Sequence, residues 1–127
     1  MPEFVAAVTC IDGRFHRQLT DWAEEALQAR YVDLVTGPGV SAPVAAGDPN
    51  VLDQITTRLT PSLEVHHAST VLVAAHEGCA GDPADPAEQR AVLPAAAARL
   101  QTRLGDQAAV TAVYLHADGR VEPVPGR

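Results

Sequence analysis

Lysine is missing from this 127-residue chain, whose nine basic side chains are all arginines. Sixteen acidic residues outnumber them and leave a formal net charge of -7. A protein that binds the phosphate backbone needs a basic face, so this balance excludes nucleic acid as an expected partner.

Long apolar runs are also missing. No stretch approaches the roughly 18 consecutive apolar residues of a membrane-spanning helix. The N-terminal stretch MPEFVAAVTC carries an early acidic residue and lacks the basic region with which a signal peptide begins. We therefore expect a cytoplasmic protein that has no contact with a membrane.

Cysteine is scarce, with only Cys10 and Cys79 in the chain. Hydrophobic residues make up 46% of the sequence, so a core can be buried without disulfide bonds. Thiols stay free in the reducing cytoplasm. The length and composition indicate a single domain that spans residues 1–127.

The hydrophobic pattern predicts alternating strands and helices. Short, nearly continuous apolar runs are typical of strands covered on both faces, and they fall at residues 3–9, 31–37, 69–76 and 108–116. Apolar residues at three- and four-residue spacing predict amphipathic helices at residues 15–30, 49–66 and 86–104. Residues 37–48 are expected to form a loop, and Pro61 to kink or break the second helix.

This order of elements predicts an α/β fold. Its centre is a mainly parallel, four-stranded sheet of order 2-1-3-4 with helices on both faces. After a turn at residues 117–120, residues 121–124 can pair back as a short antiparallel edge strand. The first and third strands are neighbours where the strand order reverses, the place where ligands bind in such sheets.

Chemically active side chains follow these two strands. Cys10 comes directly after the first strand, and His76 and Cys79 come at the end of the third. Two thiolates and an imidazole form a ligand set that suits zinc, and three protein ligands leave a fourth position for water. Zinc lowers the pKa of such a water to about 7, which provides a hydroxide nucleophile at neutral pH.

Asp12 and Arg14 alternate with Cys10 in the stretch CIDGR. In extended backbone all three side chains project the same way. A bidentate pair with Arg14 would keep Asp12 ionised, so that its carboxylate accepts a hydrogen bond from the nucleophile and orients it. Released from Arg14, the same carboxylate could occupy the fourth position on the metal.

The pattern Cys-x-Asp-x-Arg in CIDGR and His-x-x-Cys in HEGC resembles the β-class carbonic anhydrases. The segments LVAAHEGCAG and AVYLHADGRVEPV are similar to the zinc-binding segment and the closing strand of that family. The resemblance implies Zn²⁺ on Cys10, His76 and Cys79, and an Asp12–Arg14 dyad. It also implies a homodimer that reversibly hydrates carbon dioxide to bicarbonate.

Two departures from this family keep other functions open. VTGPGVSAP stands where the family usually has an Arg-Asn-Ala-Gly stretch, and the family's N-terminal helical arm has no counterpart. One alternative is a catalytically silent zinc-binding relative with a structural or regulatory role. Another is a hydrolase of a different small heterocumulene, carbonyl sulfide or carbon disulfide. A third is a thiol redox protein that uses the Cys10–Cys79 pair.

Several polar residues near these motifs are expected to have no special role. His16 is expected on a solvated helix face, with proton shuttling as the alternative. Glu77 is expected to point into solvent, with an indirect role at the metal as the alternative. Three further histidines are expected to be ordinary surface or helix-end residues: His66, His67 and His116.

Overall fold

The computed structural model describes residues 3–126 and has an α/β fold. Its elements, in chain order, are β1 (Phe4–Thr9), α1 (His16–Ala26), β2 (Tyr31–Thr36), α2 (Ser41–Ala45), α3 (Pro49–Glu64), β3 (Thr70–His76), α4 (Pro86–Leu104), a 3₁₀ turn (Gly105–Gln107), β4 (Ala109–Leu115) and β5 (Val121–Val124). The four predicted strands and three predicted helices are all present.

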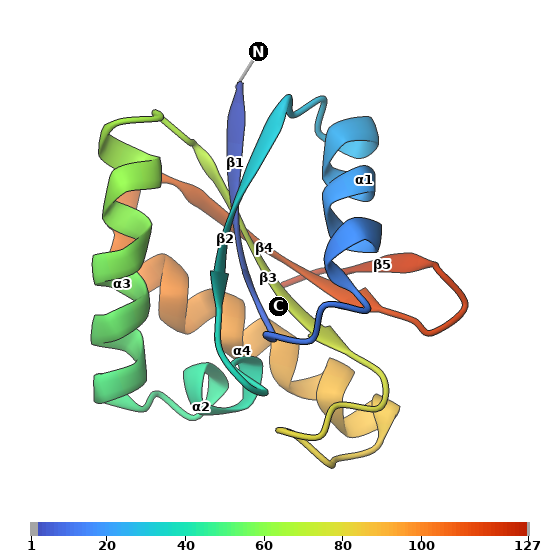
Figure 1. Ribbon diagram of the computed structural model, residues 1–127. Helices are drawn as coiled ribbons and strands as arrows, with labels where there is room; N and C mark the ends of the chain where they lie inside the picture. The colour runs from blue at the N-terminus through green and yellow to red at the C-terminus, as the bar shows by residue number, and fades with distance from the viewer. Residues whose placement is uncertain (1–2, 127) are drawn as a thin grey trace.

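The strands form one sheet in the order β2-β1-β3-β4-β5 (Figure 1). The first four strands are parallel, and β5 runs antiparallel to β4. The predicted order 2-1-3-4 and the short antiparallel edge strand are therefore confirmed. The strand order reverses between β1 and β3, so the carboxyl ends of these two neighbours meet at one edge of the sheet.

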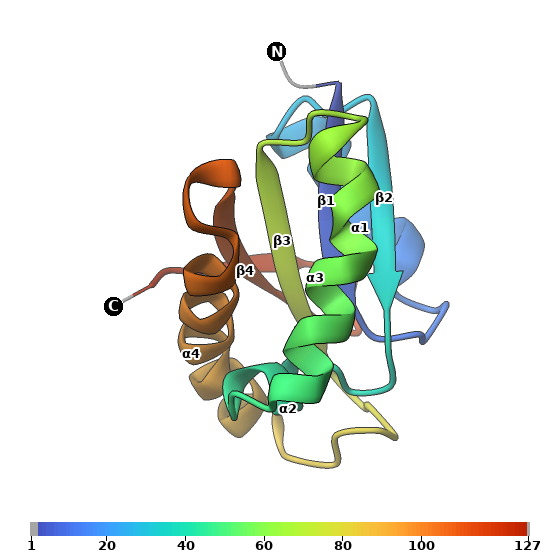
Figure 2. The ribbon, with the colours of Figure 1, turned by 90° about the vertical axis from the view of Figure 1, so that its left-hand side faces the viewer.

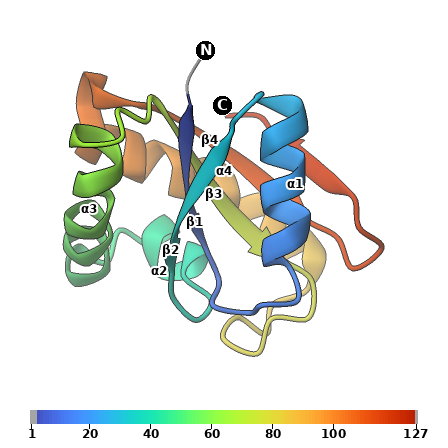
Figure 3. The same ribbon diagram turned by 45° about the horizontal axis from the view of Figure 1, so that its top comes forward.

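Helices cover both faces of the sheet, but unequally. Helix α1 packs on one face, and α2, α3 and α4 pack on the other (Figure 3). Figure 2 looks onto the second face, with α3 in front of the sheet. Along β1, Val5 and Ala7 belong to the core beneath α1, while Ala6 and Val8 belong to the core on the opposite face. Burial on both faces explains why this strand is an unbroken apolar run.

The two long helices on the second face begin as their sequences predict. The Asp48 carboxylate accepts a hydrogen bond from the backbone N–H of Asn50 at 3.0 Å, and Pro49 is the first residue of α3. The Asp85 carboxylate accepts from the N–H of Glu88 at 2.9 Å, ahead of α4. These caps satisfy amide groups that the first turn of a helix leaves without partners.

The predicted loop at residues 37–48 is wrong in part, because it contains the short helix α2. Five residues are too few to show a helical periodicity, and Pro43 and the flanking glycines indicated irregular backbone. Pro43 lies in the first turn of α2, where a backbone N–H has no intrahelical partner to lose.

Two helix ends also differ from the prediction. Helix α3 continues through Pro61 to Glu64, so the proline does not end it. Helix α1 stops at Ala26, four residues early, and Gln28 adopts a positive φ of 56°. Among residues 3–126, no helix combines the length and apolar character needed to cross a membrane.

Candidate metal centre

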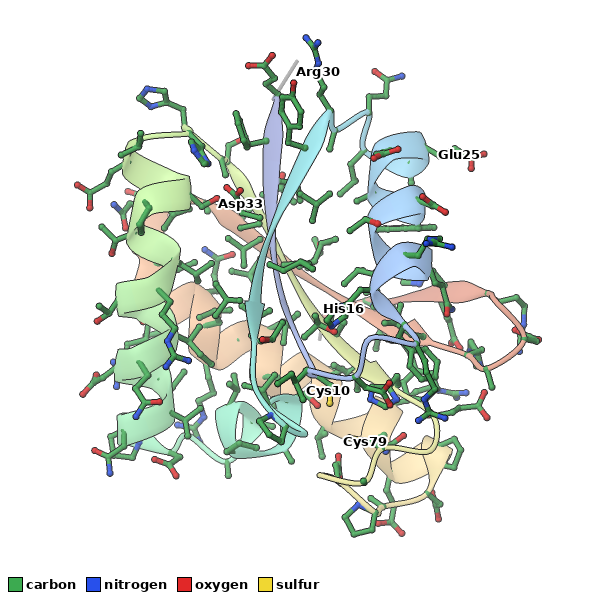
Figure 4. The ribbon with its side chains drawn as sticks, in the orientation of Figure 1. Cys10, His16, Glu25, Arg30, Asp33 and Cys79 are labelled. Atoms are coloured by element: carbon green, nitrogen blue, oxygen red, sulfur yellow. The ribbon has the colours of Figure 1, made fainter. Side chains whose placement is uncertain are left out.

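Three side chains converge at the carboxyl ends of β1 and β3. Cys10 follows β1 directly, His76 is the last residue of β3, and Cys79 lies in the loop after it. All three are buried, and their possible ligand atoms lie within 4.8 Å of one another. Figure 4 shows Cys10 and Cys79 beside each other at this edge of the sheet. The group could hold a metal ion.

The His76 ring is fixed in an orientation that suits a metal ligand. Its Nδ1 donates to the Glu77 carbonyl oxygen at 2.7 Å, which leaves the lone pair on Nε2. Nε2 is buried and has no hydrogen-bond partner among the described residues. Phe15 stacks on the ring with 4.2 Å between centroids. A buried nitrogen with no partner is costly, and a metal ion at this point would satisfy it.

The spacing of the two sulfurs matches a small tetrahedral site. Two thiolates bound at 2.3 Å to a tetrahedral zinc ion lie about 3.8 Å apart. In the structure, 3.7 Å separates Cys10 Sγ from Cys79 Sγ. The three side chains line a cavity of about 10 Å³, which has room for a single ion or water. Ligand types and spacing therefore fit zinc.

The two thiols differ in acidity. Burial raises the pKa of Cys10, but hydrogen bonds to its sulfur, chiefly from the Gly39 amide, outweigh this effect and lower the pKa to about 7. The Gly39 N–H donates to Cys10 Sγ at 3.4 Å. Burial and the neighbouring Cys10 sulfur raise the pKa of Cys79. Cys10 thus becomes a thiolate near neutral pH, whereas Cys79 needs a cation beside it to lose its proton at that pH.

Two glycines, one in the loop after β2 and one in the loop after β3, bring these loops together over the site. Gly39, before α2, has a φ of +53°, and a Cβ there would lie 2.5 Å from the Gly81 carbonyl oxygen. A Cβ on Gly81 would lie 2.8 Å from the Gly39 nitrogen. The loop after β2 and the loop after β3 therefore touch backbone to backbone, and this contact holds the Gly39 amide against Cys10 Sγ.

Asp12 and Arg14 form an ion pair next to the three ligands. Arg14 Nη2 lies 2.6 Å from Asp12 Oδ2, and the Arg14 backbone N–H also donates to this carboxylate. These hydrogen bonds lower the pKa of Asp12 to about 2. Asp12 Oδ2 lies 3.9 Å from His76 Nε2, so an ionised carboxylate borders the position that a metal ion would take.

The tripeptide Asp-Gly-Arg occurs twice in the chain, at residues 12–14 and 118–120. Comparing the two copies shows which contacts of Asp12 arise from the tripeptide and which arise from its place beside His76. Arg120 donates to the Asp118 carboxylate from both its backbone and its side chain at 2.9 Å, as Arg14 does to Asp12. The ion pair is therefore a property of the tripeptide itself. What distinguishes Asp12 is its distance from His76.

A model of the family described as "Putative carbonic anhydrase" matches residues 1–125. The chain belongs to this family. The resemblance seen in CIDGR and HEGC is thereby confirmed for nearly the whole chain. Among the curated proteins, no relative matches it.

In this carbonic anhydrase family member, His16 supports the centre in a way that the sequence did not indicate. Its Nε2 lies 2.8 Å from the Cys10 carbonyl oxygen, and because a carbonyl only accepts, Nε2 is the donor. His16 is partly buried at the start of α1, so the expectation of a solvated position is wrong. The contact ties α1 to the backbone of Cys10.

Gln89 is a second residue that sequence reasoning missed. It lines the cavity, accepts a hydrogen bond from the Tyr114 hydroxyl at 2.6 Å, and donates to the Asp82 carbonyl at 3.0 Å. Gln89 occupies a place in the buried stripe of α4 that continues with Leu93 and Ala96. The sequence signal that could have identified it is a polar residue at a position of the helix that is otherwise apolar.

Proposed function

We propose that this protein is a zinc-dependent carbonic anhydrase that reversibly hydrates carbon dioxide to bicarbonate, with Cys10, His76 and Cys79 as the zinc ligands. The observation that carries the proposal is the buried Nε2 of His76, which has no hydrogen-bond partner within residues 3–126 and lies near two sulfurs at tetrahedral spacing. Membership of the family supports the same reaction.

When bound, zinc would supply a Lewis acid that lowers the pKa of a water molecule to about 7. Asp12 would then act as a hydrogen-bond acceptor rather than as a general base, because a carboxylate with a pKa of about 2 is too weak a base to take up a proton near neutrality. In this role Asp12 orients the nucleophile toward the substrate. Arg14 orients Asp12 because its Nε donates to Oδ1 and its Nη2 donates to Oδ2.

A silent zinc-binding relative is the main alternative. The 3.9 Å between Asp12 Oδ2 and His76 Nε2 is short enough that a small movement would bring the carboxylate onto the metal. The ion pair with Arg14 opposes this movement, since both oxygens of Asp12 already accept hydrogen bonds from the guanidinium. This competition favours the active form over the silent one. Carbonyl sulfide or carbon disulfide is the alternative substrate.

We further propose a cytoplasmic homodimer built from one carbonic-anhydrase-like domain over residues 1–127. Ile11 is 61% exposed although it lies between Cys10 and Asp12, and on the edge strand β2 Tyr31 and Leu34 are 46% and 37% exposed. Exposed apolar side chains of this size favour burial against a partner. Both cysteines are free thiols, which suits a reducing compartment.

Metal analysis combined with stopped-flow carbon dioxide hydration tests the proposal on one sample. We expect one zinc per chain and activity that rises toward alkaline pH, because two anionic thiolates make a bound water less acidic than neutral ligands do. Cys79→Ser is expected to lose both metal and activity. Full zinc occupancy without hydration at neutral or alkaline pH would instead establish the silent relative.

A further inference from the structure

His116, directly after β4, is a buried histidine that lies between two carboxylates. Its Nδ1 is 3.2 Å from Glu77 Oε1, and its Nε2 is 2.8 Å from Glu122 Oε1. A carboxylate oxygen only accepts, so the bridge is complete when both ring nitrogens carry a proton. The expectation that His116 is an ordinary surface residue is therefore wrong.

The surroundings of this bridge come from four parts of the chain. Glu122 lies on β5 and also pairs with Arg90 of α4, at 3.7 Å. Gln18 of α1 donates to the His116 carbonyl oxygen at 3.0 Å. The Ala117 backbone N–H donates to the same Glu77 oxygen that faces His116. His116 is thus held by residues of α1 and β5 on one side and faces Glu77 on the other.

Glu77 connects this scaffold to the candidate ligands. Its backbone N–H donates to the Leu115 carbonyl at 3.1 Å, and its carboxylate accepts from His116. Its carbonyl oxygen accepts from His76 Nδ1 at 2.7 Å. The expectation that the Glu77 side chain points into solvent is wrong in part: the side chain is 34% exposed, but its Oε1 accepts from both His116 and the Ala117 amide.

The loop after β3 needs such a restraint. Gly78 follows Glu77 with a φ of +64°, and no atom would contact a Cβ placed there. Glycine gives the backbone more freedom than any other residue, so local sterics do not hold the backbone at Gly78, between Glu77 and Cys79. The link from His116 through Glu77 restrains the carbonyl group that aligns the His76 ring.

From this chain of contacts we infer that His116 is a positioning residue of the metal centre, which raises metal affinity by holding Glu77 and, through its carbonyl, the His76 ring. The inference rests on the proposed role of His76 as a ligand. Residues that orient a metal-binding histidine commonly change metal affinity by about 10- to 100-fold.

Two substitutions separate the two sides of the bridge. The amide nitrogen of Asn is bonded to Cγ, as Nδ1 of His is, so His116→Asn retains a donor toward Glu77. The amide nitrogen of Gln lies one atom further out, as Nε2 does, so His116→Gln retains a donor toward Glu122. If His116 acts through Glu77, only the Gln variant should impair the metal centre.

The experiment measures zinc affinity of the full chain by competition with a chromophoric chelator, alongside the thermal midpoint of each metal-free variant. We expect zinc binding within about twofold of wild type for His116→Asn and about tenfold weaker for His116→Gln. His67→Gln, at an exposed histidine, is the matched control and should bind zinc like wild type.

A second pair of variants covers the case in which His116→Gln does not fold. Glu77→Ala removes the acceptor that faces His116 and should weaken zinc binding, whereas Glu122→Ala should not. Equal zinc affinity in all variants and wild type would overturn the inference while leaving the proposed function intact. If zinc affinity falls only in proportion to the fall in the thermal midpoint of the metal-free variants, the inference would also be overturned. A wild-type protein that binds no zinc would overturn the proposed function itself.

Discussion

Asp12 and Asp118 show that the chemistry of a residue depends on its place in the fold. Each is the first residue of an Asp-Gly-Arg tripeptide and accepts hydrogen bonds from its arginine. The same contacts lower the pKa of each carboxyl group. Of the two, Asp12 lies beside His76, so it is the one placed to act at the proposed metal centre.

Asp12→Asn is expected to lower carbon dioxide hydration by about 100-fold, because the amide no longer orients the nucleophile as an anionic acceptor does. The zinc content should stay at the wild-type level, since Asp12 is not one of the three proposed ligands. Stopped-flow hydration with metal analysis measures both quantities. Asp118→Asn is the matched control and should be fully active; equal losses in both variants would contradict a specific role for Asp12.

Cys10 should titrate well below its ordinary pKa in the metal-free protein. The folded protein lowers this pKa from 9.0 to about 7, so the charged form is favoured by folding. The resulting stabilisation is present above pH 9 and is lost as the pH falls through about 7. Thiolate absorbance in the ultraviolet should therefore show a first transition near pH 7.

The Cys10→Ser variant should lack this first transition and keep a later one from Cys79, whose pKa is raised. The comparison assigns the acidic thiol to one position. A first transition in the wild-type protein near the ordinary value of 9.0 would contradict the assignment.

At the scale of elements, the two loops that touch through Gly39 and Gly81 determine how the site is enclosed. Both contacting positions are glycine, so the two backbones approach each other directly, with the Pro38 side chain beside Gly81. This approach brings the Gly39 N–H to Cys10 Sγ. Loop packing and thiol acidity are therefore coupled.

Gly81→Ala is expected to destabilise the protein by about 1–3 kcal/mol, the usual cost of forcing extra atoms into a packed region. Gly81 has no positive φ, so the effect arises from the close approach to Gly39 and not from backbone strain. Zinc affinity should fall as well, because the loops must separate. Denaturant unfolding and chelator competition measure these effects, with Gly126→Ala as a control whose Cβ meets no atom. Unchanged stability and affinity in Gly81→Ala would show that the contact is not restrictive.

The elements that could be predicted from the sequence are those with a clear pattern of apolar residues or a capping residue at their start. The run at β3 and the Asp-Pro starts of α3 and α4 are local signals, and each corresponds to an observed element. Helix α2 could not be predicted, because a five-residue helix has no period and its proline is harmless only if the helix begins at Ser41.

At the scale of the whole molecule, the alternation of strands and helices indicated a parallel sheet with right-handed connections, and the order 2-1-3-4 expected for it is confirmed. That order places Cys10, His76 and Cys79 at one edge of the sheet, where their possible ligand atoms lie within 4.8 Å of one another. Contacts between separate loops could not be predicted in the same way. Glu77 and His116 are 39 residues apart, and no local pattern indicates that their side chains meet.

Zinc is expected to stabilise the whole fold, because a ligand that binds only the native state shifts the unfolding equilibrium. Free zinc at 100 times its dissociation constant should contribute about 2.7 kcal/mol. Differential scanning fluorimetry with and without a chelator measures the shift in melting temperature. Cys79→Ser should show no such shift, and an equal shift in that variant would point to zinc bound elsewhere.

The direction of β1 has a practical consequence. The strand starts at Phe4, at the end of the sheet away from Cys10 (Figures 1 and 4). Six residues in extended conformation span about 20 Å. Since these 127 residues contain no lysine, amine-directed reagents find no side chain to couple to around the candidate metal centre. A support joined through a tag added ahead of β1 would meet the sheet at its Phe4 end, with the candidate metal centre at the opposite end of the strand.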